Sequence, residues 1–156
     1  MTLIFRALPT DEVRKLQASG PDANGRMPER HKSDGNGNPC RHCLRFIPRD
    51  AEMLIVAYRP FSDLQPYAEV GPIFLCAEPC ERHRETGALP ELFENRERIL
   101  VRGYTPDNRI KYGTGQVINT TQVEDVAARM FEDEAIAYIH MRSATNNCYQ
   151  CRIDRG

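Results

Sequence analysis

The sequence predicts an α+β fold: one compact domain over residues 1–156, with a mostly antiparallel sheet and two helices. Three observations support this prediction. Most apolar segments have the length of a strand, short turn-forming segments separate them, and only two segments carry the signals of a helix. A chain of 156 residues is also long enough to bury one hydrophobic core.

The chain begins with a short strand that is followed by a short helix. Residues 3–8, Leu-Ile-Phe-Arg-Ala-Leu, have the apolar character of a strand. The residues from Pro9 to Glu12 then supply an N-cap and acidic first-turn residues for a helix that ends near Ala18. We therefore expect one strand and one helix before the composition changes.

The segment after this helix is rich in turn-forming residues. Of the 21 residues from 19 to 39, 14 are Gly, Pro, Asn, Asp or Ser, and only Ala23 and Met27 are apolar. Such a segment buries too little apolar surface to offset the entropy cost of ordering its backbone. We therefore expect a mobile loop at about residues 19–38.

Apolar segments in the rest of the chain predict six further strands. Two of them form an antiparallel hairpin, because Thr105-Pro-Asp-Asn108 suits a type I turn. In another, Ile139 and Met141 alternate with Tyr138 and His140, so the two pairs occupy opposite faces. The expected strands cover residues 52–59, 71–76, 98–104, 109–118, 135–142 and 148–153.

The second helix is expected over residues 121–134. Thr121 and Glu124 have the spacing of a capping box at its start. Apolar residues recur at the spacing of one helix face, which we expect to pack against the sheet. These residues are Val123, Val126, Ala127, Met130 and Phe131.

The charge balance excludes a general attraction to polyanions. The chain has 21 Lys and Arg against 22 Asp and Glu, a formal net charge of −1, so nucleic acid is not an expected partner. The apolar runs are much shorter than the ~20 residues that cross a bilayer, and the amino terminus lacks a secretory pattern. We expect a cytoplasmic protein with no membrane partner.

Cysteine spacing is the strongest functional signal in the sequence. A reducing cytoplasm keeps cysteines as thiols, and close pairs of thiols suit chelation. A C-x2-C loop, for example, turns both sulfurs toward one tetrahedral ion. The six cysteines form three such pairs: Cys40 with Cys43, Cys76 with Cys80, and Cys148 with Cys151.

The first pair forms one half of an expected structural zinc site, and the second or the third pair completes it. The second pair is favoured, because the third lies in an expected strand, where residues three apart point to opposite faces. His83, three residues after Cys80, can replace one thiolate. The expected ligands are Cys40, Cys43, Cys76 and Cys80, with His83, Cys148 and Cys151 as alternates.

A cysteine-dependent enzyme or thiol redox protein is the alternative interpretation. Cys148 is the candidate nucleophile and His140 the candidate base, since a turn over residues 143–147 can fold the two together. Redox thiols favour the start of a helix, but Pro48 leaves room for barely one helical turn after Cys40. Whether the chain is an enzyme is therefore left open, and we expect Cys148 to be buried and structural.

An arginine-lined nucleic-acid binder is the third interpretation. The chain has 18 Arg and only three Lys, and arginine favours bidentate pairing with carboxylate or phosphate. Acidic residues balance this charge, so a solvated surface explains the arginines better. Those that flank the cysteine pairs are Arg41, Arg45, Arg49, Arg82 and Arg84.

Three stretches resemble a known family when they are taken as a set. They are Pro39-Cys40-Arg41, then Pro66-Tyr67 with Gly71-Pro-Ile-Phe-Leu75, and finally Ala137-Tyr-Ile-His140 with the segment from Asn147 to Arg155. As a set they resemble the bacterial domain-of-unknown-function family 1203. The resemblance spans residues 3–155 and implies one compact domain of this length, with no established activity, substrate or cofactor.

Limited proteolysis tests the expected loop. We expect a protease to cleave first within residues 19–38, because their backbone has little apolar cover, and later within residues 121–134. The sites are read by mass spectrometry of the first fragments. Earlier cleavage within 121–134 would contradict both the loop and the domain layout.

Overall fold

The computed structural model describes all 156 residues and contains eight strands, two α-helices and two 3-10 turns. Both α-helices have eight residues, and no helix is long and apolar enough to cross a membrane. The elements are β1 (Leu3–Arg6), α1 (Thr10–Gln17), β2 (Glu29–Lys32), β3 (Glu52–Tyr58), β4 (Gly71–Cys76), η1 (Glu91–Phe93), β5 (Arg98–Tyr104), β6 (Gln116–Asn119), η2 (Thr120–Gln122), α2 (Val123–Met130), β7 (Tyr138–Ser143) and β8 (Tyr149–Arg155).

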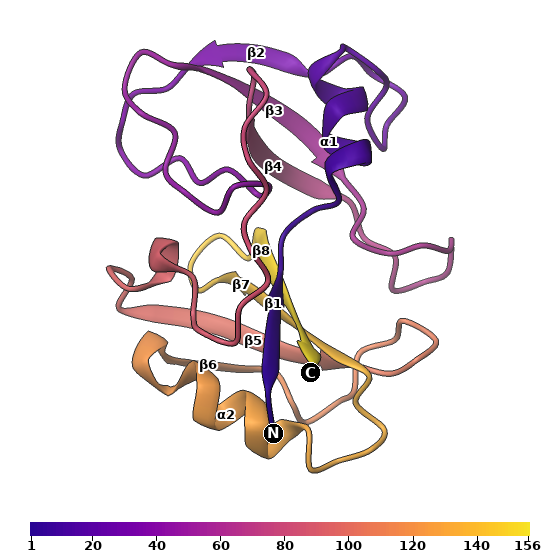
Figure 1. Cartoon of the computed structure of the whole chain (residues 1–156). Coiled ribbons are helices and arrows are strands. Elements are labelled where there is room, and N and C mark those ends of the chain that lie inside the picture. The colour runs from indigo at the N-terminus through magenta and orange to yellow at the C-terminus, as the bar shows by residue number, and fades with distance from the viewer.

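The strands form two sheets, one above the other in Figure 1. The lower sheet has five strands in the order β1-β8-β7-β5-β6, with α2 below it, and the upper sheet has three strands in the order β2-β3-β4, with α1 beside it. Every strand pair in both sheets is antiparallel. The predicted α+β fold class is confirmed.

The lower sheet and α2 enclose the larger hydrophobic core. The predicted apolar face of α2 is buried in it, together with Ile139 and Met141 of β7. The opposite face of β7 is buried as well, because Phe61 from the loop after β3 packs against Tyr104 and His140. All six residues of β7 are therefore buried, although the alternation is the predicted one.

The upper sheet and α1 enclose a second core, to which Val13 of α1 and Leu54 of β3 contribute. The N-cap, Pro9, lies within the expected segment, but no side chain caps the helix. The Thr10 hydroxyl forms a hydrogen bond with His42, at 2.9 Å. Thr10 therefore makes a tertiary contact and does not cap the helix.

Residues 19–38 contain a strand where a loop was expected. β2 pairs with the edge of β3, and all four of its side chains are exposed. Its position depends on backbone hydrogen bonds, so no apolar pattern marks it in the sequence. The mobility of the rest of this segment stays a prediction.

The start of the second helix differs by a few residues from the expected one. The capping box is formed by Asn119 and Gln122, and the side chain of each accepts a hydrogen bond from a backbone amide at η2. The expected box of Thr121 and Glu124 does not form. The Thr121 hydroxyl donates to the Asn119 side chain at 2.7 Å. The chain therefore enters α2 through a 3-10 turn that satisfies its first amides.

The predicted hairpin is present with a shorter second strand. The turn forms as expected, since the amide of Asn108 donates to the carbonyl of Thr105 at 2.9 Å. β5 then pairs with residues 116–119, whereas residues 109–115 make only one isolated bridge, between Tyr104 and Ile110. Gly113, with φ of +89°, interrupts the strand there.

A substitution tests the observed cap. Asn119→Ala removes the acceptor for the Thr121 amide, and we expect it to lower the free energy of unfolding by about 1 kcal/mol. Asp125→Ala, at an exposed first-turn residue of α2 that makes no side-chain hydrogen bond, is the matched control and should cost less. Urea denaturation followed by circular dichroism measures both. An equal loss for the two variants would contradict the observed cap.

Candidate metal centre

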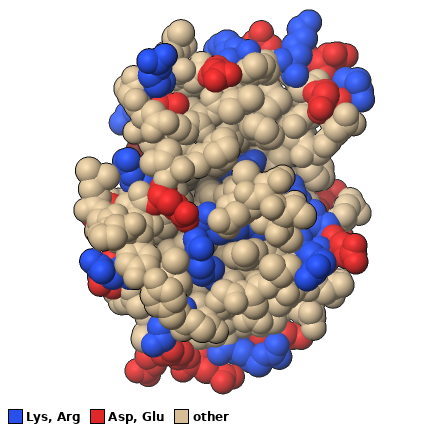
Figure 2. All heavy atoms as spheres, turned by 180° about the vertical axis from the view of Figure 1, so that it is seen from behind, with Lys and Arg blue, Asp and Glu red and all other residues tan.

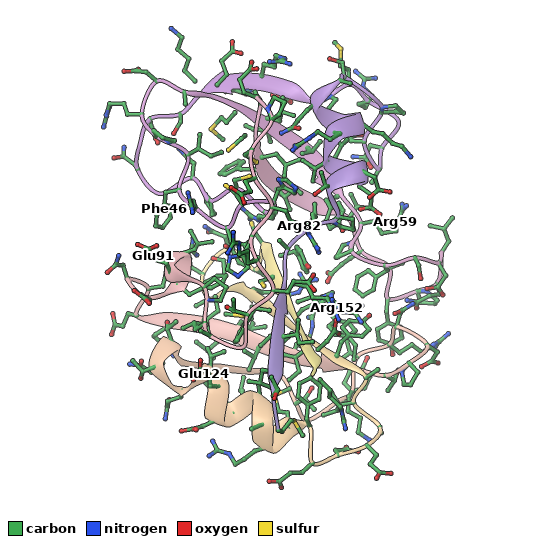
Figure 3. The ribbon with its side chains drawn as sticks, in the orientation of Figure 1. Phe46, Arg59, Arg82, Glu91, Glu124 and Arg152 are labelled. Atoms are coloured by element: carbon green, nitrogen blue, oxygen red, sulfur yellow. The ribbon has the colours of Figure 1, made fainter.

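Four cysteines that are far apart in the sequence meet in the upper part of the molecule. The ligand atoms of Cys40, Cys43, Cys76 and Cys80 all lie within 4.8 Å of one another. Sulfur atoms, yellow in Figure 3, gather there between the loops. Cys40 is completely buried and the other three are partly buried. This cluster, the four-cysteine cluster, can hold a metal ion.

The first half of the cluster is a tight hairpin turn. Residues Pro39 and Phe46 form an isolated antiparallel bridge, and the amide of Leu44 donates to the carbonyl of Cys40 at 2.9 Å. Leu44 has a positive φ of 52°, which turns the chain back on itself. The turn brings the thiols of Cys40 and Cys43 to the same side, as the C-x2-C spacing predicts.

The second half follows directly from the end of β4. Cys76 is the last residue of that strand, and its amide donates to the sulfur of Cys40 at 3.3 Å. Two side chains of α1 then hold the loop that leads to Cys80. Gln17 donates to the carbonyl of Cys76 at 2.9 Å, and Arg14 donates to the carbonyl of Cys80 at 2.8 Å.

The thiols perturb one another strongly. Hydrogen bonds from Cys43 and Cys76 hold the pKa of the Cys40 thiol far below its usual value. The same contacts raise the pKa of Cys76 and of Cys80, because each would become a second thiolate beside Cys40. The contact with Cys40 opposes the ionisation of Cys43, but hydrogen bonds from Cys76 and Cys80 lower its pKa. Thiolates therefore form more readily in the first pair than in the second, and a nearby cation would stabilise all four.

His42 supports the cluster, although the spacing of the cysteines gives no sign of it. Its ring is buried, with Nδ1 at 3.0 Å from the sulfur of Cys80 and Nε2 at 2.9 Å from the hydroxyl of Thr10. Burial lowers the pKa of His42, which favours the neutral ring. A neutral ring that donates from Nδ1 to a thiolate can accept from Thr10 at Nε2.

The other expected ligands lie outside the cluster. The backbone amide of His83 donates to the carbonyl of His42, while its buried Nε2 has no partner. Cys151 is buried in the lower core, near the carbonyl of Arg6. Cys148 is partly buried rather than fully buried as expected, and it lies 3.8 Å from the carbonyl of Asn146.

The structure does not bring Cys148 and His140 together. The His140 ring packs between aromatic rings, with that of Tyr149 at 4.9 Å and that of Tyr104 at 4.5 Å. It lines a different cavity from Cys148. Burial and nearby arginines, Arg142 first, hold the pKa of His140 well below its usual value. No hydrogen bond links the expected nucleophile to the expected base.

The comparison with protein families identifies the chain. The family model described as "Protein of unknown function (DUF1203)" matches residues 37–155. The chain belongs to this family. The matched region contains all four cysteines of the cluster, but the description of DUF1203 assigns no activity. No curated protein and no solved structure matches the chain.

The burial of the last two cysteines predicts different reactivity. Burial raises the pKa of Cys151 to about 12, so its thiolate is scarce at pH 8 and increases only as the pH approaches 12. We expect iodoacetamide at pH 8 to modify Cys148 well before Cys151, as measured by peptide mapping of the folded protein. Equal rates would show that the lower core opens on the time scale of the reaction. Urea-unfolded protein is the control, in which both thiols should react alike.

Proposed function

We propose that this DUF1203 protein is a binding or interaction module stabilised by one structural zinc ion. The ligands are Cys40, Cys43, Cys76 and Cys80. The observation that carries the proposal is the convergence of their four sulfurs, which come from the hairpin turn at residues 39–46 and from the end of β4 with the loop after it. Four thiolates around one ion are typical of structural zinc sites, which have no open coordination position.

The distances support zinc as the metal. The sulfurs of Cys40 and Cys80 are 3.9 Å apart. Zn–S bonds of about 2.3 Å in a tetrahedral arrangement separate the sulfurs by about 3.8 Å. Soft thiolate ligands also favour zinc over calcium or magnesium, which prefer oxygen.

A zinc ion at this position would have a structural role. It would join the hairpin turn at residues 39–46 to the loop after β4. Neither segment contains a helix or a named strand of its own. His42 would supply a hydrogen bond to one ligand sulfur, a contact typical of the second layer of a zinc site. A site closed by four protein ligands leaves no position for a substrate on the metal, so the module would act through its surface.

A reducing cytoplasm is part of the proposal. All six cysteines are free thiols in the structure, and thiolates must stay reduced to bind zinc. A cysteine-dependent enzyme is the weaker alternative, because Cys148 has no base beside it. An arginine-lined nucleic-acid binder is weaker again, because ion pairs engage many of its arginines, including Arg6, Arg82 and Arg102.

Metal analysis tests the zinc site. We expect the purified protein to carry about one equivalent of zinc, and Cys43→Ser to release it. Loss of the ion should also lower the melting temperature, by about 10 °C, because metal-binding free energy is folding free energy. Native mass spectrometry measures the metal, and calorimetry measures the melting temperature.

Cys148→Ser is the matched control, since it removes a cysteine outside the cluster and should leave the zinc content unchanged. Chelation of the unmodified protein gives the same comparison without a substitution. Metal-free protein in which the thiols of the four-cysteine cluster react freely would refute the zinc site. Equal metal loss from Cys43→Ser and Cys148→Ser would refute the ligand assignment.

A further inference from the structure

A small pocket lies between the two parts of the molecule, on the side of β8 that faces the cluster. Its volume is about 160 Å³. The pocket is lined by ten residues, none of them acidic. Figure 2 shows basic side chains, with an acidic side chain beside them, in the recess between the upper and lower parts on one face of the molecule. The polar residues that line the pocket include Arg41, Arg96, Ser143, Asn146, Cys148 and Gln150.

Arg41 places a buried positive charge at this pocket. It is only 3% exposed, yet it takes part in none of the ion pairs of the structure. Its Nε donates to the carbonyl of Tyr149 and its Nη1 to the carbonyl of Pro39, both at 2.8 Å. Two neutral carbonyls hold the guanidinium in place without neutralising it. Buried charges in proteins are usually paired.

Arg96 adds a second unneutralised charge. It is half-buried, lines the same pocket, and forms no ion pair. Both side chains are cations at neutral pH, and no carboxylate lines the pocket with them. Two guanidinium groups in this arrangement favour the binding of an anion.

Gln150 adds a polar group to the lining of the pocket. It is 3% exposed, and its Nε2 faces the carbonyl of Cys148 at 3.5 Å. Its Oε1 is buried and has no hydrogen-bond donor. The lining therefore offers cationic and neutral polar groups to an anion, and no acidic side chain that would repel it.

We propose that this pocket binds inorganic phosphate. Its oxygens would accept from the guanidinium groups of Arg41 and Arg96. The pocket is smaller than the ~300–1,000 Å³ typical of organic ligands, which favours the free anion over a nucleotide. The proposal goes beyond the zinc site and does not depend on it.

Binding is measured on the full chain in a phosphate-free buffer by titration calorimetry with sodium phosphate. We expect saturable binding of phosphate, and no saturable binding of chloride at the same ionic strength, because chloride lacks the oxygens that accept from planar guanidinium groups. Arg96→Gln should weaken phosphate binding about tenfold or more, because it removes one charge-assisted contact. Arg129→Gln, an exposed arginine on α2, is the matched control and should leave the affinity unchanged.

A second measurement reports where phosphate binds. Phosphate should slow the alkylation of Cys148, which lines the same pocket. The proposal is refuted by the absence of saturable binding, by equal effects of Arg96→Gln and Arg129→Gln, or by an alkylation rate of Cys148 that phosphate leaves unchanged. Zinc content is measured on the same samples, so a failure of the metal site is seen separately.

Discussion

Arg41 is the residue at which the two parts of the molecule are joined. Its carbonyl accepts from the amide of Leu8, between β1 and α1, and its amide donates to Phe74 of β4. Its side chain reaches the carbonyl of Tyr149 on β8. One residue therefore connects the start of the chain, the upper sheet and the lower sheet. The hairpin turn that contains it must stay in place, and this is the turn that the four-cysteine cluster fixes.

The same turn serves both proposed sites. Cys40 and Cys43 point toward the other two cysteines, while Arg41, between them in the sequence, points toward the pocket beside β8. A metal that fixes the two thiols would also limit the freedom of the guanidinium. Figure 3 labels two other arginines, Arg82 on the segment that follows β4 and Arg152 on β8. Both are paired with acids, Glu85 and Asp154, unlike Arg41.

The sequence predicted the parts of this structure that depend on local pattern. The face of α2 and most strands follow from apolar spacing, and the close approach within the first two cysteine pairs follows from their short spacing. The third pair has equally short spacing but lies outside the cluster. β2 could not be predicted, because its side chains are exposed and it is held by backbone pairing and by the ion pair of Arg30 with Glu52 of β3. The role of His42 could not be predicted either, because it depends on Thr10 of α1. The lining residues of the pocket lie far apart in the chain, so no local pattern marks it.

The pairing of β1 with β8 has a consequence for the order in which the protein is made. Leu3 lies opposite Arg155, so the first strand leaves the ribosome long before its partner exists. The lower sheet can close only after residues 149–155 have been synthesised. The upper sheet, α1 and all four cysteines of the cluster lie within residues 10–80. A nascent chain could therefore bind the proposed metal before β8 has been synthesised and has paired with β1.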